Sequence, residues 1–66
     1  MKVNAKKLFA IAADKGYMLK DLAAAAGVSY ATLQAIKHGE TVRVDTLGKL
    51  AKALQVKSID IMDMEV

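Results

Sequence analysis

With 66 residues the chain is long enough for one folded unit, and we expect a single domain over residues 1–66. It has no cysteine and a single histidine, which excludes a disulfide framework, a thiolate metal site and the usual nucleophile and base pairs of enzymes. The absence of proline and the abundance of alanine favour an all-α fold.

The formal net charge of +3 is divided unevenly along the chain. All ten Lys and Arg residues lie within residues 1–57 together with four acidic residues, which gives +6, whereas residues 58–66 carry three acidic residues. A basic body with an acidic tail suits a polyanionic partner. An ordinary solvated surface is about equally compatible with the charge alone.

Apolar spacing predicts a first helix near the start of the chain. Asn4 can cap it, and Gly16 is its expected end. Leu8, Ile11 and Ala12 would share its buried face.

The stretch Lys20–Gly39 predicts two short helices joined by a tight turn. Gly27 can adopt the positive φ that reverses the chain, and Ser29 can cap the second helix by accepting from its first backbone N–H groups. Leu33 and Ile36, three positions apart, would face the core. The outward face then carries Tyr30, Ala31, Gln34 and Lys37.

A loop over residues 40–43 leads into another predicted helix. Its apolar positions repeat at i, i+3, i+4 and i+7, namely Leu47, Leu50, Ala51 and Leu54. Gly48 inside this helix is unfavourable by about 1 kcal/mol relative to alanine. The close approach of another backbone is one explanation for it.

The segment Ser58–Val66 fits two different structures. A short helix capped by Ser58 would place Ile59 and Met62 on one side, whereas the alternation of apolar and acidic residues from Met62 onward has the period of a strand. We expect this segment to supply a homodimer contact, as a helix or as a paired strand. A short helix or tail that covers its own core is equally compatible with the composition.

Taken together, these features resemble the phage Cro and repressor (XRE-like) family of helix-turn-helix regulators, and the resemblance covers nearly the entire chain. It is carried by the segment Leu47–Leu54 and by the following residues: Leu22, Ala23, Gly27, Val28, Ser29, Leu33, Ile36 and Gly39. It implies an all-α, compact five-helix, lambda-repressor-like domain. It further implies a cytoplasmic regulator, with repression as the expected activity, whose recognition helix, about Ser29–His38, enters the major groove of double-stranded DNA.

The resemblance also implies which residues contact DNA. Positions that match base-contacting positions of the family are Tyr30, Ala31 and Gln34, with Ala35 at the fringe. Positions that match phosphate contacts are Ser29, His38 and Arg43, and the charges of two further residues favour the same role: Lys20 and Lys37. Each assignment has a structural alternative: Tyr30 could cover the turn, Gln34 could lie on a solvated face, and His38 could bind the last helical carbonyls.

Two departures from the family pattern affect these contacts. Met18 and Leu19 stand where the family usually has Ser or Thr followed by a Gln that contacts phosphate, so one usual anchor is missing. Lys37 stands where the family commonly has Glu. A base at this position favours contact with the DNA backbone.

Other functions find little support in the sequence. We expect no enzymatic activity and no cofactor. We expect no metal site either, because three carboxylates near a chain end, Asp60, Asp63 and Glu65, are usually a solvated tail. Neither a membrane span nor a targeting segment nor a small-molecule effector is expected. The alternative to DNA binding is a protein-interaction or antitoxin-like helix-turn-helix, which the plain alanines at positions 31 and 35 permit.

Overall fold

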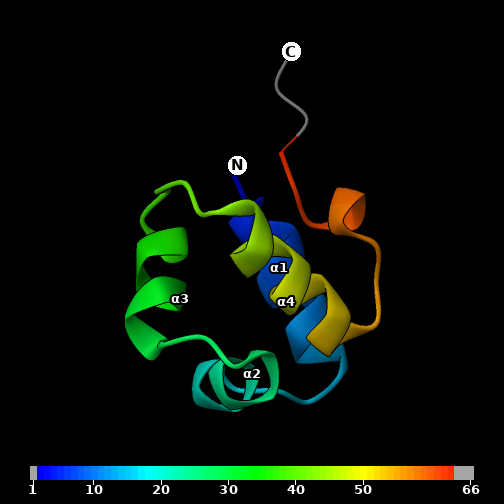
Figure 1. Ribbon diagram of the computed structural model, residues 1–66. Coiled ribbons are helices and arrows are strands. Elements are labelled where there is room, and N and C mark those ends of the chain that lie inside the picture. Colours follow the sequence, from blue (N-terminus) through cyan, green and yellow to red (C-terminus); the bar gives the residue numbers. More distant parts are fainter. Residues whose placement is uncertain (1, 64–66) are drawn as a thin grey trace.

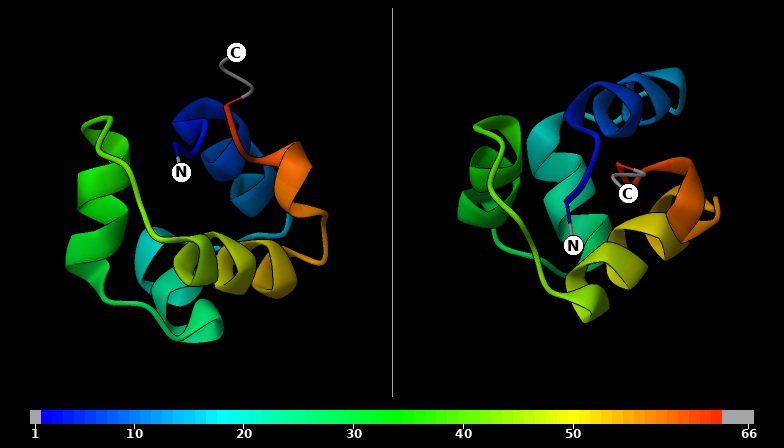
Figure 2. Two further views of the ribbon diagram at one scale, coloured as in Figure 1. Left: turned by 45° about the horizontal axis from the view of Figure 1, so that its top comes forward. Right: turned by 90° about the horizontal axis from the view of Figure 1, so that it is seen from above.

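The computed structural model describes residues 2–63. Its elements in chain order are α1 (Ala5–Asp14), α2 (Leu19–Ala26), α3 (Tyr30–Lys37), α4 (Val44–Leu54) and one 3₁₀ turn, η1 (Ser58–Asp60). The four α-helices contain eight to eleven residues each, and none of the helices in this part of the chain is long and apolar enough to cross a membrane. Figures 1 and 2 show α3 and η1 on opposite sides of the molecule.

The core is built from the apolar faces of all four helices. α2 packs against both α3 and α4, and η1 packs against α4. The predicted core positions of the four helices are confirmed, except that Ile11 is only half-buried. No polar or charged side chain of residues 2–63 is buried, so the buried contacts between the helices are apolar. The buried residues are Val3, Leu8, Ala12, Leu22, Ala23, Ala26, Leu33, Ile36, Leu47, Leu50, Ala51, Leu54 and Ile61.

Hydrogen bonds tie the two ends of the described chain together. Asn4 caps α1 as predicted, since its side-chain oxygen accepts from the backbone N–H of Lys7 at 3.0 Å. The Asn4 amide also donates to the Asp63 carboxylate at 3.1 Å, and its backbone N–H donates to the Ile61 carbonyl at 2.8 Å. The start of α1 is therefore held by the segment that follows η1.

The fifth helix is wrong as an α-helix, because η1 is a single 3₁₀ turn. Its N-cap is Lys57 rather than Ser58, and the Lys57 N–H donates to the Asp60 carboxylate at 3.1 Å. The predicted apolar face is also wrong: Ile59 is 53% exposed, whereas Ile61 is completely buried. The backbone leaves the helical conformation at Ile61, which has φ −122°, and the next residue, Met62, forms a bridge with Val3, so the turn does not extend into a helix.

The strand-like alternation from Met62 onward gives one bridge and no extended strand within residues 2–63. Met62 forms an isolated antiparallel bridge with Val3, and Lys2 forms another with Thr41. The partner of Met62 is thus the N-terminal segment of its own chain. The later positions of the alternation, 64–66, lie outside the described residues.

Close packing does not explain Gly48. A Cβ atom placed on it would meet nothing within 4 Å, and the residue is exposed on α4. The prediction that another backbone approaches it is therefore wrong. The structure gives no reason for a glycine at this position.

Candidate nucleic-acid interface

The turn between α2 and α3 is set by the left-handed conformation of Gly27, which has φ +71°. The backbone N–H of Val28 then donates to the Ala23 carbonyl at 3.0 Å and closes the end of α2. A residue with a Cβ atom is strained at such a φ, so the predicted role of Gly27 is confirmed. The two helices form a helix-turn-helix pair.

Ser29 caps α3, as predicted. Its Oγ accepts from the backbone N–H of Thr32 at 3.1 Å and lies 2.9 Å from the Thr32 hydroxyl oxygen. A hydroxyl offers one donor and two acceptor positions. When Thr32 donates to Ser29, both acceptor positions of Ser29 are used, and its own O–H remains able to donate to an external group. Capping is therefore compatible with a phosphate contact.

The N-cap residue of α2, Met18, makes no cap hydrogen bond with its side chain. The backbone N–H of Met18 donates to the Asp21 carboxylate at 3.0 Å, which is half of a capping box. The Met18 side chain is 64% exposed. The helix end that carries a phosphate-binding amide in the resembling family is apolar here, with Met18 followed by a half-buried Leu19.

The outward face of α3 combines two alanines with three longer side chains, those of Tyr30, Gln34 and Lys37. Leu33 and Ile36 are buried, as predicted, and hold the helix on the core. Tyr30 is 50% exposed, and Ala31 and Lys37 are also exposed, whereas Gln34 and Ala35 are half-buried at the edge of this face.

At the end of α3 the chain turns sharply. The backbone N–H of His38 donates to the Gln34 and Ala35 carbonyls, both at 3.1 Å, and Gly39 follows with φ +86°. The His38 backbone thus satisfies the last carbonyls of the helix. Its side chain lies at the surface.

Several candidate contact residues share depressions beside α3. Ala35 and Arg43 line a groove of about 380 Å³ between α3 and the start of α4. Lys20 and Tyr30 line a depression of about 510 Å³ at the starts of α2 and α3. Lys37 lines a third, against α1 and α2. Ser29, Ala31, Gln34 and His38 line none of these three.

The cations around α3 are free to bind an external anion. Within residues 2–63, the side chains of Lys20, Lys37 and Arg43 form no ion pair. Lys20 is in the first turn of α2, Lys37 is in the last turn of α3, and Arg43 is the N-cap of α4. Positive charge therefore reaches the helix-turn-helix pair from three separate elements.

Two threonines that the sequence analysis did not single out lie beside Arg43. Thr41 and Thr46 line the groove between α3 and α4, as does Thr32. Their hydroxyls add neutral donors next to a guanidinium group, a combination suited to a phosphate. In the sequence, the only signal for this groove is that a threonine stands near Arg43 on either side. It was not sufficient, because the path of the loop decides whether these threonines face α3.

No metal centre is found in the part of the chain that the structure covers. No three His, Cys, Asp or Glu side chains of residues 2–63 come close enough to hold an ion. Of the three acidic residues considered at the C-terminal end, Glu65 lies outside the described residues.

The protein is a small helical domain in which a helix-turn-helix pair exposes its second helix between free cations. This arrangement is typical of DNA-binding regulators. The family model of the Cro/C1-type HTH DNA-binding domain matches residues 7–66. The chain therefore belongs to this family of DNA-binding domains, which confirms the resemblance found in the sequence. The family is one of DNA-binding regulators. None of the curated proteins compared with the chain matches it significantly.

Proposed function

We propose that the protein is a small transcriptional regulator, most simply a cytoplasmic repressor, that binds a specific sequence of double-stranded DNA. The observation that carries the proposal is the α3 surface, where the face with Tyr30, Ala31, Gln34 and Lys37 is fixed outward by the burial of Leu33 and Ile36. An α-helix fits the major groove of B-DNA, where every base pair presents a distinct pattern of donors and acceptors. The alanines at positions 31 and 35 allow the helix to approach the bases, while Tyr30, Gln34 and Lys37 are long enough to reach bases or phosphates.

Base contacts in this proposal come from α3. The Gln34 amide pairs bidentately with an adenine, and the Ala31 methyl contacts a thymine methyl group. Tyr30, half exposed in the first turn, donates its hydroxyl to a base or to the adjacent backbone. Ala35 lies at the fringe of these contacts, on the side of Arg43.

Phosphate contacts flank the helix in the same proposal. Lys20, Lys37 and Arg43 supply charge, and His38 supplies a donor where α3 ends. The Ser29 hydroxyl donates at the other end of α3 while Thr32 donates to it. Such contacts fix the position of the helix along the groove and make the affinity fall with salt.

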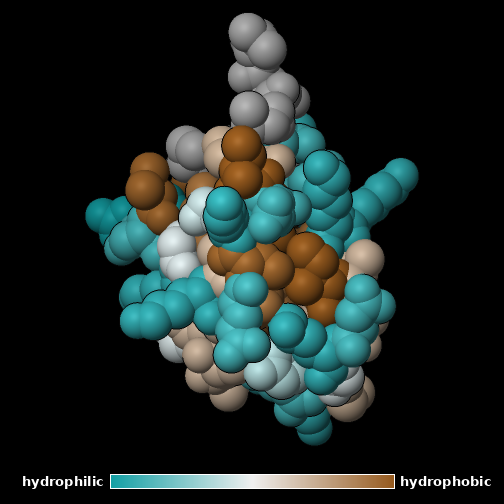
Figure 3. All heavy atoms as spheres, turned by 90° about the vertical axis from the view of Figure 1, so that its right-hand side faces the viewer, coloured by the Kyte–Doolittle hydropathy of each residue, from teal (hydrophilic) through white to brown (hydrophobic). Residues whose placement is uncertain are grey.

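The proposal extends to a homodimer, with η1 as the contact. The Ile59 side chain is 53% exposed on this turn, which lies across the molecule from α3 (Figure 1). Figure 3 shows apolar atoms gathered in the middle of the face on that side, with polar residues around them. A two-fold contact here would leave α3 of both subunits free to bind half-sites about one helical turn apart.

Selection of bound duplexes from a random DNA pool, followed by sequencing, tests the proposed function. We expect enrichment of a roughly palindromic site whose half-sites are about 10 base pairs apart. Enrichment of a single half-site would support sequence-specific binding and contradict the dimer. Binding without enrichment would contradict base recognition by α3.

A second candidate function is the binding of a protein partner through the helix-turn-helix face. It is favoured by the exposed Met18 side chain beside Tyr30 at the starts of α2 and α3. The two functions differ in their salt dependence, because counterion release makes DNA affinity fall steeply with salt. An absence of duplex binding, with salt-insensitive capture of one protein, would favour this second function.

A further inference from the structure

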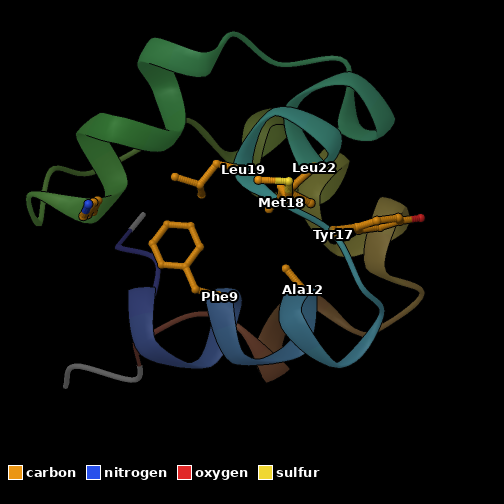
Figure 4. Close-up of a pocket in the computed structure, with 7 residues that line it drawn as sticks. Phe9, Ala12, Tyr17, Met18, Leu19 and Leu22 are labelled. Atoms are coloured by element: carbon orange, nitrogen blue, oxygen red, sulfur yellow. The ribbon is translucent and has the colours of Figure 1, made fainter.

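A pocket of about 260 Å³ lies between α1, the start of α2 and the end of α3. Figure 4 shows Phe9 and Ala12 of α1 projecting toward Met18, Leu19 and Leu22 across the opening. Ala12 and Leu22 belong to the core, whereas Phe9 and Leu19 are half-buried at its edge. The pocket therefore extends from the surface to side chains of the hydrophobic core.

The chemistry of its lining is uneven. Six of the lining residues supply apolar or aromatic surface: Phe9, Ala12, Tyr17, Met18, Leu19 and Leu22. The Tyr17 hydroxyl points away from the space between α1 and α2 (Figure 4). Lys37 is the one charged residue of the lining, and within residues 2–63 its ammonium group has no ion-pair partner.

We infer that this pocket binds a small apolar monocarboxylate, with the hydrocarbon group between α1 and α2 and the carboxylate on Lys37. A concave, mostly apolar site with one charged group is the usual form of a small-molecule site, and its apolar lining favours hydrocarbon over water. Its volume is below the range of about 300–1,000 Å³ that is usual for drug-sized ligands, so a single ring or a short alkyl chain is the matching size. Two aromatic rings and a thioether in the lining favour an aryl group.

Occupation of the pocket would oppose DNA binding. This step rests on the proposed function, in which Lys37 contacts phosphate. The carboxylate and the phosphate need the same ammonium group, so each weakens the binding of the other. The site thus lies within the DNA-binding fold and needs no separate effector domain.

The first test is an NMR titration of the full chain, without DNA, with phenylpropanoate as the probe and phenylpropanol as its uncharged analogue. We expect saturable shifts of the Leu19 and Leu22 methyl signals with a dissociation constant below about 1 mM. The alcohol should bind about 2- to 5-fold more weakly, because an exposed ion pair contributes little more than this. Absence of saturable shifts up to about 5 mM would overturn the site.

Exposed positions provide variants that leave the core unchanged. In Lys37→Gln the difference between the acid and the alcohol should disappear. Met18→Glu places a like charge on the rim and should weaken the acid about 3-fold or more, whereas Val44→Glu, at an exposed position outside the pocket, should not. Equal binding of the acid and the alcohol by the native chain would overturn the carboxylate assignment.

A second measurement tests the competition separately. Saturating phenylpropanoate should weaken binding of the native protein to a selected duplex by about 2-fold or more, but not that of Lys37→Gln. If the probe binds and the duplex affinity is unchanged, the competition is wrong while the site remains. If no duplex binds, the proposed function fails and the titration still decides the site.

Discussion

Ser29 and Thr32 join the turn of the helix-turn-helix to its second helix, since the Ser29 Oγ accepts from the Thr32 backbone N–H at 3.1 Å and lies 2.9 Å from the Thr32 hydroxyl oxygen. The first hydrogen bond fixes where α3 begins. The second leaves the Ser29 O–H able to donate outward when Thr32 is the donor. Ser29 thus both caps the N-terminal end of α3 and offers a hydrogen-bond donor to an external group at the same end.

Ser29→Ala is therefore expected to lower the free energy of unfolding by about 1 kcal/mol, through loss of the cap. In a chain of this size such a change lowers Tm by about 4–8 °C, which circular dichroism can measure. Thr32→Val keeps the backbone N–H bond and is the control. A loss of stability in the control as large as that in Ser29→Ala would contradict the capping role.

Two glycines should respond in opposite directions to alanine. Gly48 is in an exposed helical position where a Cβ atom meets nothing within 4 Å, so Gly48→Ala should stabilise the fold by about 0.5–1 kcal/mol. Gly27 has φ +71°, and Gly27→Ala should destabilise it by about 1–2 kcal/mol. Urea unfolding of both variants measures the difference. Destabilisation by Gly48→Ala would contradict the open space that the structure shows around this position.

The helices could be predicted from the sequence because their signals are local. Caps at Asn4 and Ser29, the turn at Gly27 and the apolar repeat Leu47–Leu54 depend on residues within one or two turns of each other. These features were confirmed. The family pattern also located the helix-turn-helix pair, since it depends on the same short spacings.

The end of the described chain could not be predicted in the same way. The burial of Ile61 in place of Ile59 depends on hydrogen bonds to Lys2 and Asn4, about sixty positions away in the sequence. Periodicity within a nine-residue segment carries no information on such a partner. The groove beside Arg43 and the pocket beside Lys37 were missed for the same reason, because each is formed by separate elements.

Lys37→Ala should weaken binding to all duplexes alike. If its ammonium group contacts one phosphate, its removal should reduce the steepness of log K against log salt by about 0.9. Titrations at several salt concentrations measure the slope. Lys52→Ala is a matched control, because the end of α4 that carries this lysine lies away from α3 (Figure 1). An equal change of slope in both variants would mean that Lys37 acts only through the net charge of the protein, and not through a phosphate contact of its own.

Ile59→Asp should convert the proposed homodimer to a monomer, since it places a charge at the centre of the contact. Sedimentation equilibrium measures the change. A truncation before η1 is unsuitable, because it would remove Ile61 from the core. Val44→Asp, at a position that is 68% exposed on α4, is the control. A native monomer, or a dimer that persists in Ile59→Asp, would contradict a contact through η1.

The central claim is that α3 recognises bases in the major groove, and the most direct test combines Gln34→Ala with modified DNA. Each adenine of a selected duplex is replaced in turn by 7-deazaadenine, which lacks the N7 acceptor of the major groove. At one position per half-site, we expect the native protein to lose about 5-fold in affinity, the effect of one hydrogen bond of about 1 kcal/mol, and Gln34→Ala to lose nothing further. Equal losses in both proteins at every position would contradict the recognition of adenine by Gln34. Tolerance of every replacement by the native protein would contradict it as well.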